Sequence, residues 1–357
     1  GRWPRPPGYF PSKEGSRVTK TRRINLALQG GGAHGAFTWG VLDRILDEEW
    51  LEVAAISGTS AGALNGAAFK AGMAEGGREG ARETLRSLWS QVGGYDAMPG
   101  TDWLKPFLPG IEYAAKLGEA FMPVSPSDFA AQVVSPYDWG PFWRNPLEPA
   151  VMALHIDHVQ SDEGPRLFVA ATNVHDGKVR VFGDGEVTHQ AILASACLPT
   201  FFRAVEIDGQ SYWDGGYSAN PALHPLYAAD LPDDVVIVSL NPQLRPDVPG
   251  SAQEILNRIN EISFNAALLR DLRAIAFVKR LIAEGSVKKG AMKDVLVHLI
   301  ADDELMRSLS ARTKVAPTPM LLDTLFEAGR GAADRFLSAH GDDLGARGTV
   351  DLAAMFG

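Results

Sequence analysis

The chain has 357 residues, of which 45% are hydrophobic and 22% charged, and its formal net charge is -9. This is the composition of a globular protein with a sizeable core. The acidic balance argues against a nucleic-acid partner, because phosphates attract clustered Lys and Arg. A single cysteine, Cys197, excludes an intrachain disulfide and favours a reducing compartment. No run of about 18 apolar residues is present, so we expect no membrane-spanning helix and a cytoplasmic protein.

Three regions follow from the distribution of residues along the chain. Residues 1–23 are rich in Pro, Lys and Arg and predict a flexible basic arm, because such a segment is too polar to bury itself. Residues 24–249 carry the strands and motifs of a catalytic domain. Residues 250–357 predict a helical C-terminal region packed on that domain, since apolar residues recur at spacings of three and four from Ile255 to Ile275.

The first 75 residues contain the same unit twice. The apolar run from Ile24 to Leu28 predicts a buried strand, and a glycine-rich loop and a helical pattern through Trp50 follow it. A second run, Val53 to Ile56, leads through another glycine-containing turn into an alanine-rich helix at 63–74. Two consecutive strand-turn-helix units predict an α/β fold with a parallel sheet and helices on its faces.

The pattern breaks at about residues 75–160, where Pro and Gly are scattered among aromatic residues. We interpret this stretch as an insertion that caps the domain, and it contains four of the eight tryptophans: Trp89, Trp103, Trp139 and Trp143. Strand character returns at Leu167 to Asn173. The Asp176-Gly177 and Asp208-Gly209 pairs then predict hairpin turns, and residues 235–240 predict another buried strand.

The pentapeptide Gly58-Thr-Ser-Ala-Gly62 fits the pattern G-x-S-x-G, with Ser60 at its centre. Glycines flank the serine in such a motif because a tight strand-to-helix turn leaves no room for side chains beside the exposed hydroxyl. The motif follows a predicted strand and opens a predicted helix, which is the context that it requires. We therefore predict that Ser60 is a nucleophile, with Gly58 and Gly62 forming its turn.

The glycine loop before residue 35 has two interpretations. The amides of Gly30, Gly31 and Gly32 stand at a helix N-terminus and could bind the oxyanion of an acyl-transfer reaction. Gly30, Gly32 and Gly35 also fit G-x-G-x-x-G, the fingerprint of dinucleotide-binding oxidoreductases. That fingerprint requires an acidic residue at the end of the next strand, where this chain has Ser57-Gly-Thr-Ser60. We therefore favour the oxyanion hole.

A serine hydroxyl needs a base to accept its proton. Asp214 is the predicted base, because it follows the strand-like pair Tyr212-Trp213 and precedes two glycines that let the backbone pass closely. A Ser-His-Asp triad is the alternative, and three histidines follow Asp214 in the order that α/β-hydrolases use: His224, His298 and His340.

The glycine loop, G-x-S-x-G and D-G-G occur in an order that resembles the patatin-like phospholipase family. The resemblance covers about Ile24 to Asn220 and includes the segment Ala194-Ser-Ala-Cys-Leu-Pro199. It implies a three-layer α/β/α fold with a mainly parallel sheet, a Ser60–Asp214 dyad without a catalytic histidine, and an oxyanion hole at Gly30–Gly32. Plant patatins usually have Asp where this chain has Gln29 and Arg where it has His34. We assign His34 no catalytic role.

The resemblance also implies a lipid acyl ester as substrate, whether phospholipid or lysophospholipid. A short-chain ester and an intracellular polyhydroxyalkanoate remain alternatives on the same fold, and a non-enzymatic scaffold remains the alternative outside enzymes. The basic, partly apolar stretch at 270–289 could contact the inner surface of a membrane, although we favour a solvated face of a packed helix as its explanation. No His, Asp and Glu cluster has metal-ligand spacing, so we expect no metal or other cofactor. The sequence leaves the oligomeric state open.

Overall fold

The computed structural model describes residues 21–93, 135–138, 145–183, 185–199, 201–250, 252–288, 290–309, 313–314 and 317–356. The strands are β1 (Arg22–Leu28), β2 (Leu51–Thr59), β3 (Arg166–Asn173), β4 (Val179–Phe182), β5 (Val205–Ile207), β6 (Gln210–Asp214), β7 (Asp234–Val238) and β8 (Leu296–Ile300). The α-helices are α1 (Gly35–Ile45), α2 (Ala61–Val92), α5 (Glu148–Met152), α6 (Ile156–Gln160), α7 (His189–Ser195), α8 (Ala252–Ala283), α9 (Asp303–Ser308), α11 (Pro319–His340) and α12 (Leu352–Phe356). Single 3-10 turns include η1 (Gly32–His34), η4 (Gly215–Tyr217) and η5 (His224–Tyr227).

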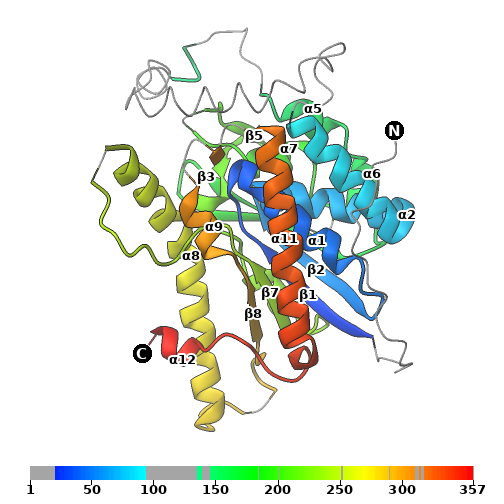
Figure 1. Ribbon diagram of the computed structural model, residues 1–357, viewed down its shortest axis with the longest axis vertical. Coiled ribbons are helices and arrows are strands. Elements are labelled where there is room, and N and C mark those ends of the chain that lie inside the picture. The colour runs from blue at the N-terminus through cyan, green and yellow to red at the C-terminus, as the bar shows by residue number, and fades with distance from the viewer. Residues whose placement is uncertain are drawn as a thin grey trace.

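One mainly parallel sheet forms the centre of the molecule (Figure 1). Its strand order is β5-β6-β3-β2-β1-β7-β8, and β4 also pairs with β3. The strands from β3 through β8 along this order are parallel, whereas β4, β5 and β6 form antiparallel pairs at the β3 side. Parallel strands end at the same edge of a sheet, so the loops after β1 and β2 meet there.

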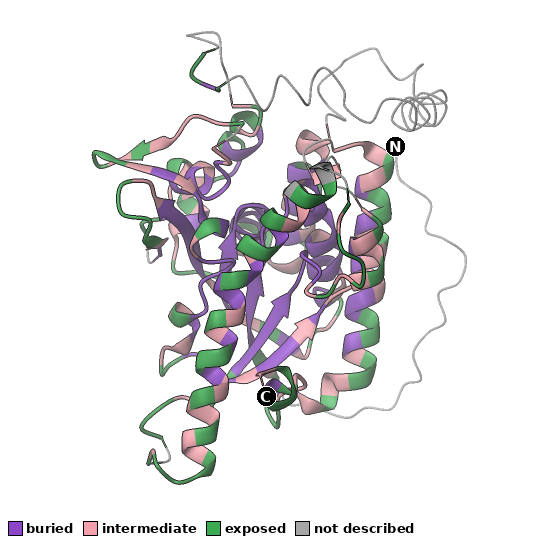
Figure 2. Cartoon of the chain, turned by 90° about the vertical axis from the view of Figure 1, so that its left-hand side faces the viewer, coloured by how far each residue is buried: buried purple, intermediate pink, exposed green. Residues whose placement is uncertain are grey.

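Helices cover both faces of the sheet, and the sheet itself is buried between them (Figure 2). Leu26 and Leu28 of β1 face a core that includes residues of α1, α2 and α11. Ala27 between them faces a second core, to which α8 and α12 contribute. This alternation of side chains along a strand produces the three layers and confirms the α/β/α architecture that the sequence predicted.

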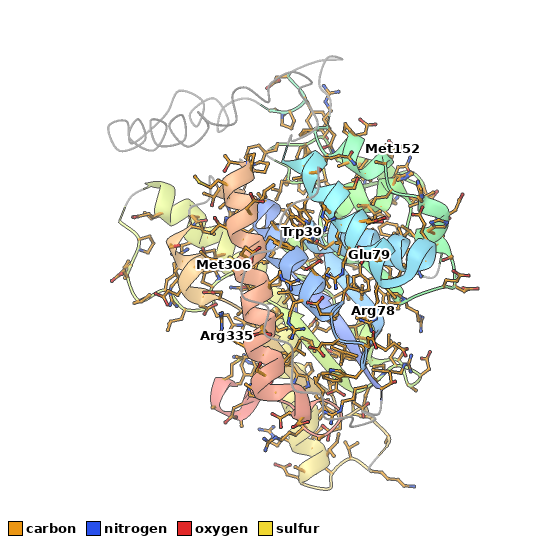
Figure 3. The ribbon with its side chains drawn as sticks, turned by 45° about the vertical axis from the view of Figure 1, so that its right-hand side comes forward. Trp39, Arg78, Glu79, Met152, Met306 and Arg335 are labelled. Atoms are coloured by element: carbon orange, nitrogen blue, oxygen red, sulfur yellow. The ribbon has the colours of Figure 1, made fainter. Side chains whose placement is uncertain are left out.

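Aromatic residues join α1, α2 and α11 on the first face. The ring of Trp39, labelled in Figure 3, stacks on Trp89 at 6.5 Å and lies 4.2 Å from Phe326, centroid to centroid. The indole of Trp89 also donates a hydrogen bond of 2.9 Å to Asn65. Trp89 is therefore a core residue of α2 and no part of a cap.

The structure adds two elements that the sequence did not predict. The helix predicted at 63–74 is the first part of α2, and the backbone leaves the helical conformation just beyond its predicted end, at Gly76 and Gly77. A second helical part follows as far as Val92, in a stretch predicted as part of the cap. The C-terminal region is not wholly helical, since β8 extends the sheet parallel to β7. Trp103, Trp139 and Trp143 of the predicted cap lie outside the described residues, as does most of the predicted basic arm.

The predicted hairpins are confirmed. β3 and β4 are antiparallel around Asp176-Gly177, and β5 and β6 are antiparallel around Asp208-Gly209. In the described part of the chain, no helix combines the length and the apolar character needed to cross a membrane.

Candidate active site

Ser60 lies at the turn between β2 and α2, where the backbone is strained. Its φ is 54°, a left-handed conformation that is rare outside glycine. A Cβ on Gly58 would lie 2.5 Å from the carbonyl oxygen of Gly62, and a Cβ on Gly62 would lie 2.1 Å from that of Leu28. The turn thus has no space for side chains at either glycine, and this tightness projects the serine from the backbone at the N-terminus of α2.

The Ser60 turn is also fixed by a buried serine on a neighbouring segment. The backbone amide of Ser60 donates a hydrogen bond of 2.9 Å to the Ser195 hydroxyl, which in turn donates to the carbonyl oxygen of Ala170 at 2.6 Å. Ser195 belongs to the segment that carried the family resemblance but had no assigned role in the sequence. The structure gives it one: it connects the nucleophile turn to β3.

Asp214 ends β6 and lies fully buried beside Ser60. The Ser60 side chain lies close enough to interact with its carboxyl group, and the amide of Gly216 donates a hydrogen bond to the same group at 2.8 Å. Burial disfavours the charged carboxylate and raises the pKa of Asp214 to about 7, although the Gly216 amide and the nearby Ser60 hydroxyl oppose the shift. The carboxyl group can therefore gain and lose a proton near neutral pH, which is the property that a general base needs.

The two glycines after Asp214 allow close packing on both sides. A Cβ on Gly215 would lie 2.2 Å from the carbonyl oxygen of Ala170, and one on Gly216 would lie 3.0 Å from the Asp214 carboxylate. Side chains at these positions would push Asp214 away from the sheet and from Ser60. The D-G-G sequence is thus required by the packing of η4 on β3.

The glycine loop lies directly against Ser60. A Cβ on Gly30 would stand 2.8 Å from the Ser60 Cβ. The Gly30 amide is already occupied, because it donates a hydrogen bond of 2.7 Å to the side chain of Asn220. Among the described residues, the amides of Gly31 and Gly32, at the start of η1, are not held by a comparable side chain. Sequence reasoning had included Gly30 among these donors and had not identified Asn220.

The side chain of Gln29 fixes the start of this loop, because both the oxygen and the nitrogen of its amide form hydrogen bonds. Its oxygen accepts hydrogen bonds from the backbone amides of Leu240 and Asn241 at 2.9 and 3.2 Å. Its nitrogen donates to the carbonyl oxygen of Asn220 at 3.3 Å and to the side chain of Asn265 at 3.4 Å. An ionised aspartate accepts hydrogen bonds only, so it could not make the last two contacts. Residue 29 of this chain must therefore both accept and donate hydrogen bonds, which glutamine can do and an ionised aspartate cannot.

A C-terminal segment covers the far side of the glycine loop. The His34 ring hydrogen-bonds to the Thr313 hydroxyl at 2.7 Å, and the carbonyl oxygen of Lys314 would lie 2.2 Å from a Cβ on Gly32. Burial, assisted by the nearby Lys314 charge, lowers the pKa of His34 to about 3. His34 is therefore neutral near pH 7, and its observed contact is with Thr313.

The geometry does not favour the alternatives to the dyad. His298 hydrogen-bonds to Asp234 at 3.0 Å, His340 hydrogen-bonds to Asp343 at 3.0 Å, and His224 is exposed on η5. The glycine loop of a dinucleotide site must leave space for a pyrophosphate. Here the Lys314 carbonyl and the Asn220 side chain fill the space beside Gly32 and Gly30.

A strained serine turn, a buried carboxyl group and a glycine loop at one edge of a mainly parallel sheet define the class of acyl-ester hydrolases. A family model described as patatin-like phospholipase matches residues 26–227, which is more than half of the chain. The chain therefore belongs to the patatin-like phospholipase family, and it is a lipid acyl-ester hydrolase. No curated protein matches it significantly.

Distant structural neighbours are found among solved structures. VipD from Legionella pneumophila is 13% identical, with 92% of this chain and 72% of that chain covered and a TM-score of 0.44. Human GIVD cytosolic phospholipase A2, solved with methyl gamma-linolenyl fluorophosphonate, is 13% identical, with 93% and 60% covered and a TM-score of 0.37. The ExoU–SpcU complex of Pseudomonas aeruginosa gives 18% identity, 94% and 75% coverage and a TM-score of 0.29. The family assignment rests on the match over residues 26–227.

Proposed function

We propose that this protein hydrolyses lipid acyl esters with Ser60 as nucleophile and Asp214 as its base. The observation that carries the proposal is the placement of the Ser60 side chain beside the buried Asp214 carboxyl group, whose pKa is raised to about 7. A base with a pKa near the working pH accepts a proton readily and also returns it to a leaving group. No histidine is required for either step.

The proposed reaction has two halves. Asp214 accepts the Ser60 proton while Ser60 Oγ attacks the ester carbonyl, and the amides of Gly31 and Gly32 donate hydrogen bonds to the developing oxyanion. Asp214 then returns the proton to the departing alcohol as the carbon–oxygen bond breaks, which leaves an acyl-Ser60 ester. A water molecule, deprotonated by Asp214, attacks this ester, releases the fatty acid and restores Ser60.

Exposed apolar side chains near the site support a lipid substrate and contact with a membrane surface. Tyr217, three residues after Asp214, is 41% exposed, and its ring packs on Phe264 of α8 at 5.3 Å. The two isoleucines that precede Phe264 on this helix, Ile259 and Ile262, are 52% and 54% exposed. Leu244 and Val248, in the loop after β7, are also exposed. Such residues can enter an acyl-chain layer, whereas a short-chain ester would not require them.

Labelling by a fluorophosphonate probe tests the assignment of the nucleophile. We expect the probe to label the wild-type chain, to label Ser308→Ala equally, and not to label Ser60→Ala. Ser308 is a suitable control because it lies on α9 and its hydroxyl only caps a helix turn at Leu305. Asp214→Asn should reduce labelling at least about 100-fold, since the serine loses its base. Labelling of folded Ser60→Ala at the wild-type rate would refute the proposal.

The substrate class is tested by comparing p-nitrophenyl esters of increasing chain length with phospholipid vesicles. We expect long-chain esters and vesicles to be hydrolysed with a higher kcat/KM than a short-chain ester. Ile259→Ser and Ile262→Ser together should lower the rate on vesicles and leave the rate on a soluble short-chain ester unchanged. A preference for short esters that these substitutions do not alter would support the short-chain esterase, and hydrolysis of polyhydroxyalkanoate granules alone would support the depolymerase.

A further inference from the structure

Away from the acyl-hydrolase site, one glutamate and two histidines lie close together, and both residue types commonly bind metal ions. Glu75 is the last residue of α2 before the bend at Gly76. His155 directly precedes α6, and His158 lies within that helix. One carboxylate oxygen and two imidazole nitrogens of these residues all lie within 4.8 Å of one another. Figure 3 shows the neighbouring residues Glu79 on α2 and Met152 on α5 on the same side of the molecule. Ser60 lies 15 residues before Glu75, roughly 22 Å along a helix.

The contacts within this cluster are longer than ordinary hydrogen bonds. Nδ1 of His155 is 3.4 Å and Nδ1 of His158 is 3.9 Å from the same carboxylate oxygen of Glu75. Hydrogen bonds between nitrogen and oxygen are usually 2.7–3.2 Å long. Nδ1 of His158 is also buried and has no hydrogen-bond partner. A buried polar atom without a partner is costly, and a cation at the centre of the cluster would supply the missing interaction.

The spacing of the three atoms suits a tetrahedral ion. Zinc binds imidazole nitrogen at about 2.0–2.1 Å and carboxylate oxygen at about 2.0–2.2 Å, so two ligand atoms of a tetrahedron are about 3.4 Å apart. The contacts of 3.4 and 3.9 Å need only small movements to reach this value. The two imidazole rings lie edge to face, at 69° and 5.5 Å between centroids, which lets both nitrogens converge on one point.

We propose that Glu75, His155 and His158 bind a zinc ion, with a water molecule as the fourth ligand. A surface pocket of about 220 Å³ adjoins Glu75 and His155 and provides space for that water. Its wall is formed partly by side chains of the second part of α2: Glu83, Thr84 and Ser87. Two histidines with one glutamate are a known ligand set for zinc with an open fourth position.

The ion would connect two segments that lie far apart in the sequence. His155 follows Glu75 by 80 residues, and Glu75 directly precedes the bend of α2 at Gly76 and Gly77, where the backbone leaves the helical conformation. Zinc bound here would hold α6 against the bend and stabilise the folded chain without taking part in ester hydrolysis. The wide separation of the ligands explains why sequence spacing did not predict the site.

Zinc binding to the full, chelator-treated chain tests this proposal. Calorimetric titration should show one zinc equivalent, and a zinc concentration 100-fold above Kd should raise Tm by about 5 °C. His155→Gln and His158→Gln should each weaken binding at least about 100-fold, because loss of even an outer partner of a metal ligand costs 10- to 100-fold. His175→Gln, on the exposed turn after β3, is the control and should bind zinc like the wild type.

The cobalt-loaded chain gives an independent measurement. Co²⁺ in the same site should show the intense visible absorption of a four-coordinate ion, and His158→Gln should abolish it. The proposal is overturned if the wild type binds no zinc saturably, if both histidine variants bind zinc as the wild type does, or if cobalt shows only the weak spectrum of an octahedral ion. The histidines are at least partly exposed, so their replacement should leave the fold intact, which circular dichroism would verify.

Discussion

Asp214 combines two properties that usually conflict, because it is both completely buried and available as a base. Burial raises its pKa from 3.8 to about 7, and the hydrogen bond from Gly216 together with the nearby Ser60 hydroxyl limits the shift. A serine hydroxyl and a backbone amide stabilise the carboxylate but carry no net charge. A lysine or arginine would instead offset the negative charge of the carboxylate and lower its pKa. The proposed dyad needs no histidine, because the environment gives an aspartate a pKa in the range usual for histidine.

The raised pKa predicts how activity depends on pH. Asp214 must be charged to accept the Ser60 proton, so kcat/KM on a soluble ester should rise about tenfold per pH unit below about 6 and level off above about 8. His34 does not contribute to this profile, since its pKa is lowered to about 3. Measurement of kcat/KM from pH 5 to 9 checks this expectation, with His34→Gln as the comparison. A midpoint near 4 would contradict the assignment.

The raised pKa of Asp214 also predicts that the folded chain loses stability as the pH rises. The folded-state pKa lies above the unfolded value, so the folded chain holds a proton that the unfolded chain releases between about pH 4 and 7. The free energy of unfolding therefore falls as pH rises through this window, by about 4 kcal/mol if the shift is complete. Asp214→Asn should consequently have a higher Tm than the wild type at pH 8, and the difference should shrink toward pH 4.

Helix α1, which follows the glycine loop, and helix α11 are held together by backbone contacts. A Cβ on Gly40 of α1 would lie 1.9 Å from the carbonyl oxygen of Phe326, and one on Gly329 of α11 would lie 2.0 Å from that of Phe37. The two helices thus touch through their glycines, which permits an approach closer than larger residues allow. Figure 1 shows α11 lying along α1, the helix that follows the glycine loop.

Two glycines of α11 make a matched test of this contact. Gly329→Ala should lower Tm by about 5 °C or more, because the added methyl group must separate α1 from α11. Gly331→Ala should keep or raise Tm, since its Cβ would meet only the Arg335 side chain at 3.5 Å and alanine favours a helix. Thermal unfolding of both variants decides the question, and equal Tm values would refute the close-packing argument.

Local patterns in the sequence predicted the elements that position Ser60 and Asp214. The apolar run before residue 57 is continuous and the one before residue 29 is interrupted only by Asn25, so β1 and β2 were recognisable as buried strands, and Gly58 and Gly62 indicated a tight turn. Contacts between distant segments left no such signal. Asn220 reaches Gly30 across 190 residues, and β8 joins the sheet from a region whose helical spacing obscured it. The helical part of α2 after Gly77 was not predicted, because scattered Pro and Gly in the stretch from residue 75 favoured an inserted cap.

At the scale of the whole molecule, the C-terminal region completes the site. The Lys314 ammonium donates a hydrogen bond of 3.0 Å to the side-chain oxygen of Asn241. The side-chain nitrogen of Asn241 in turn donates to the Gly30 carbonyl at 3.0 Å. Burial lowers the pKa of Lys314, and the charge of Glu261 opposes this shift. The glycine loop is thus supported by a residue more than 280 positions away, beyond the segment that the family model covers.

Replacement of Lys314 tests this support. Lys314→Met should lower kcat on a soluble ester about tenfold and Tm by several degrees, because Asn241 loses its donor and no longer holds Gly30 firmly. Lys288→Met, at an exposed lysine after α8, should change neither quantity. A fall in Tm with an unchanged kcat would show that Lys314 supports the fold alone and not the loop.

The contact between α1 and α11 also has a consequence for the order of events during protein synthesis. Pro319 follows Ile45 by 274 residues, so a ribosome adding about 5–20 residues per second makes α11 roughly 14–55 s after α1. During this interval the apolar face of α1 lacks its partner, and the oxyanion loop before it lacks Lys314. The nascent chain thus contains Ser60 well before the residues that support its site have been made.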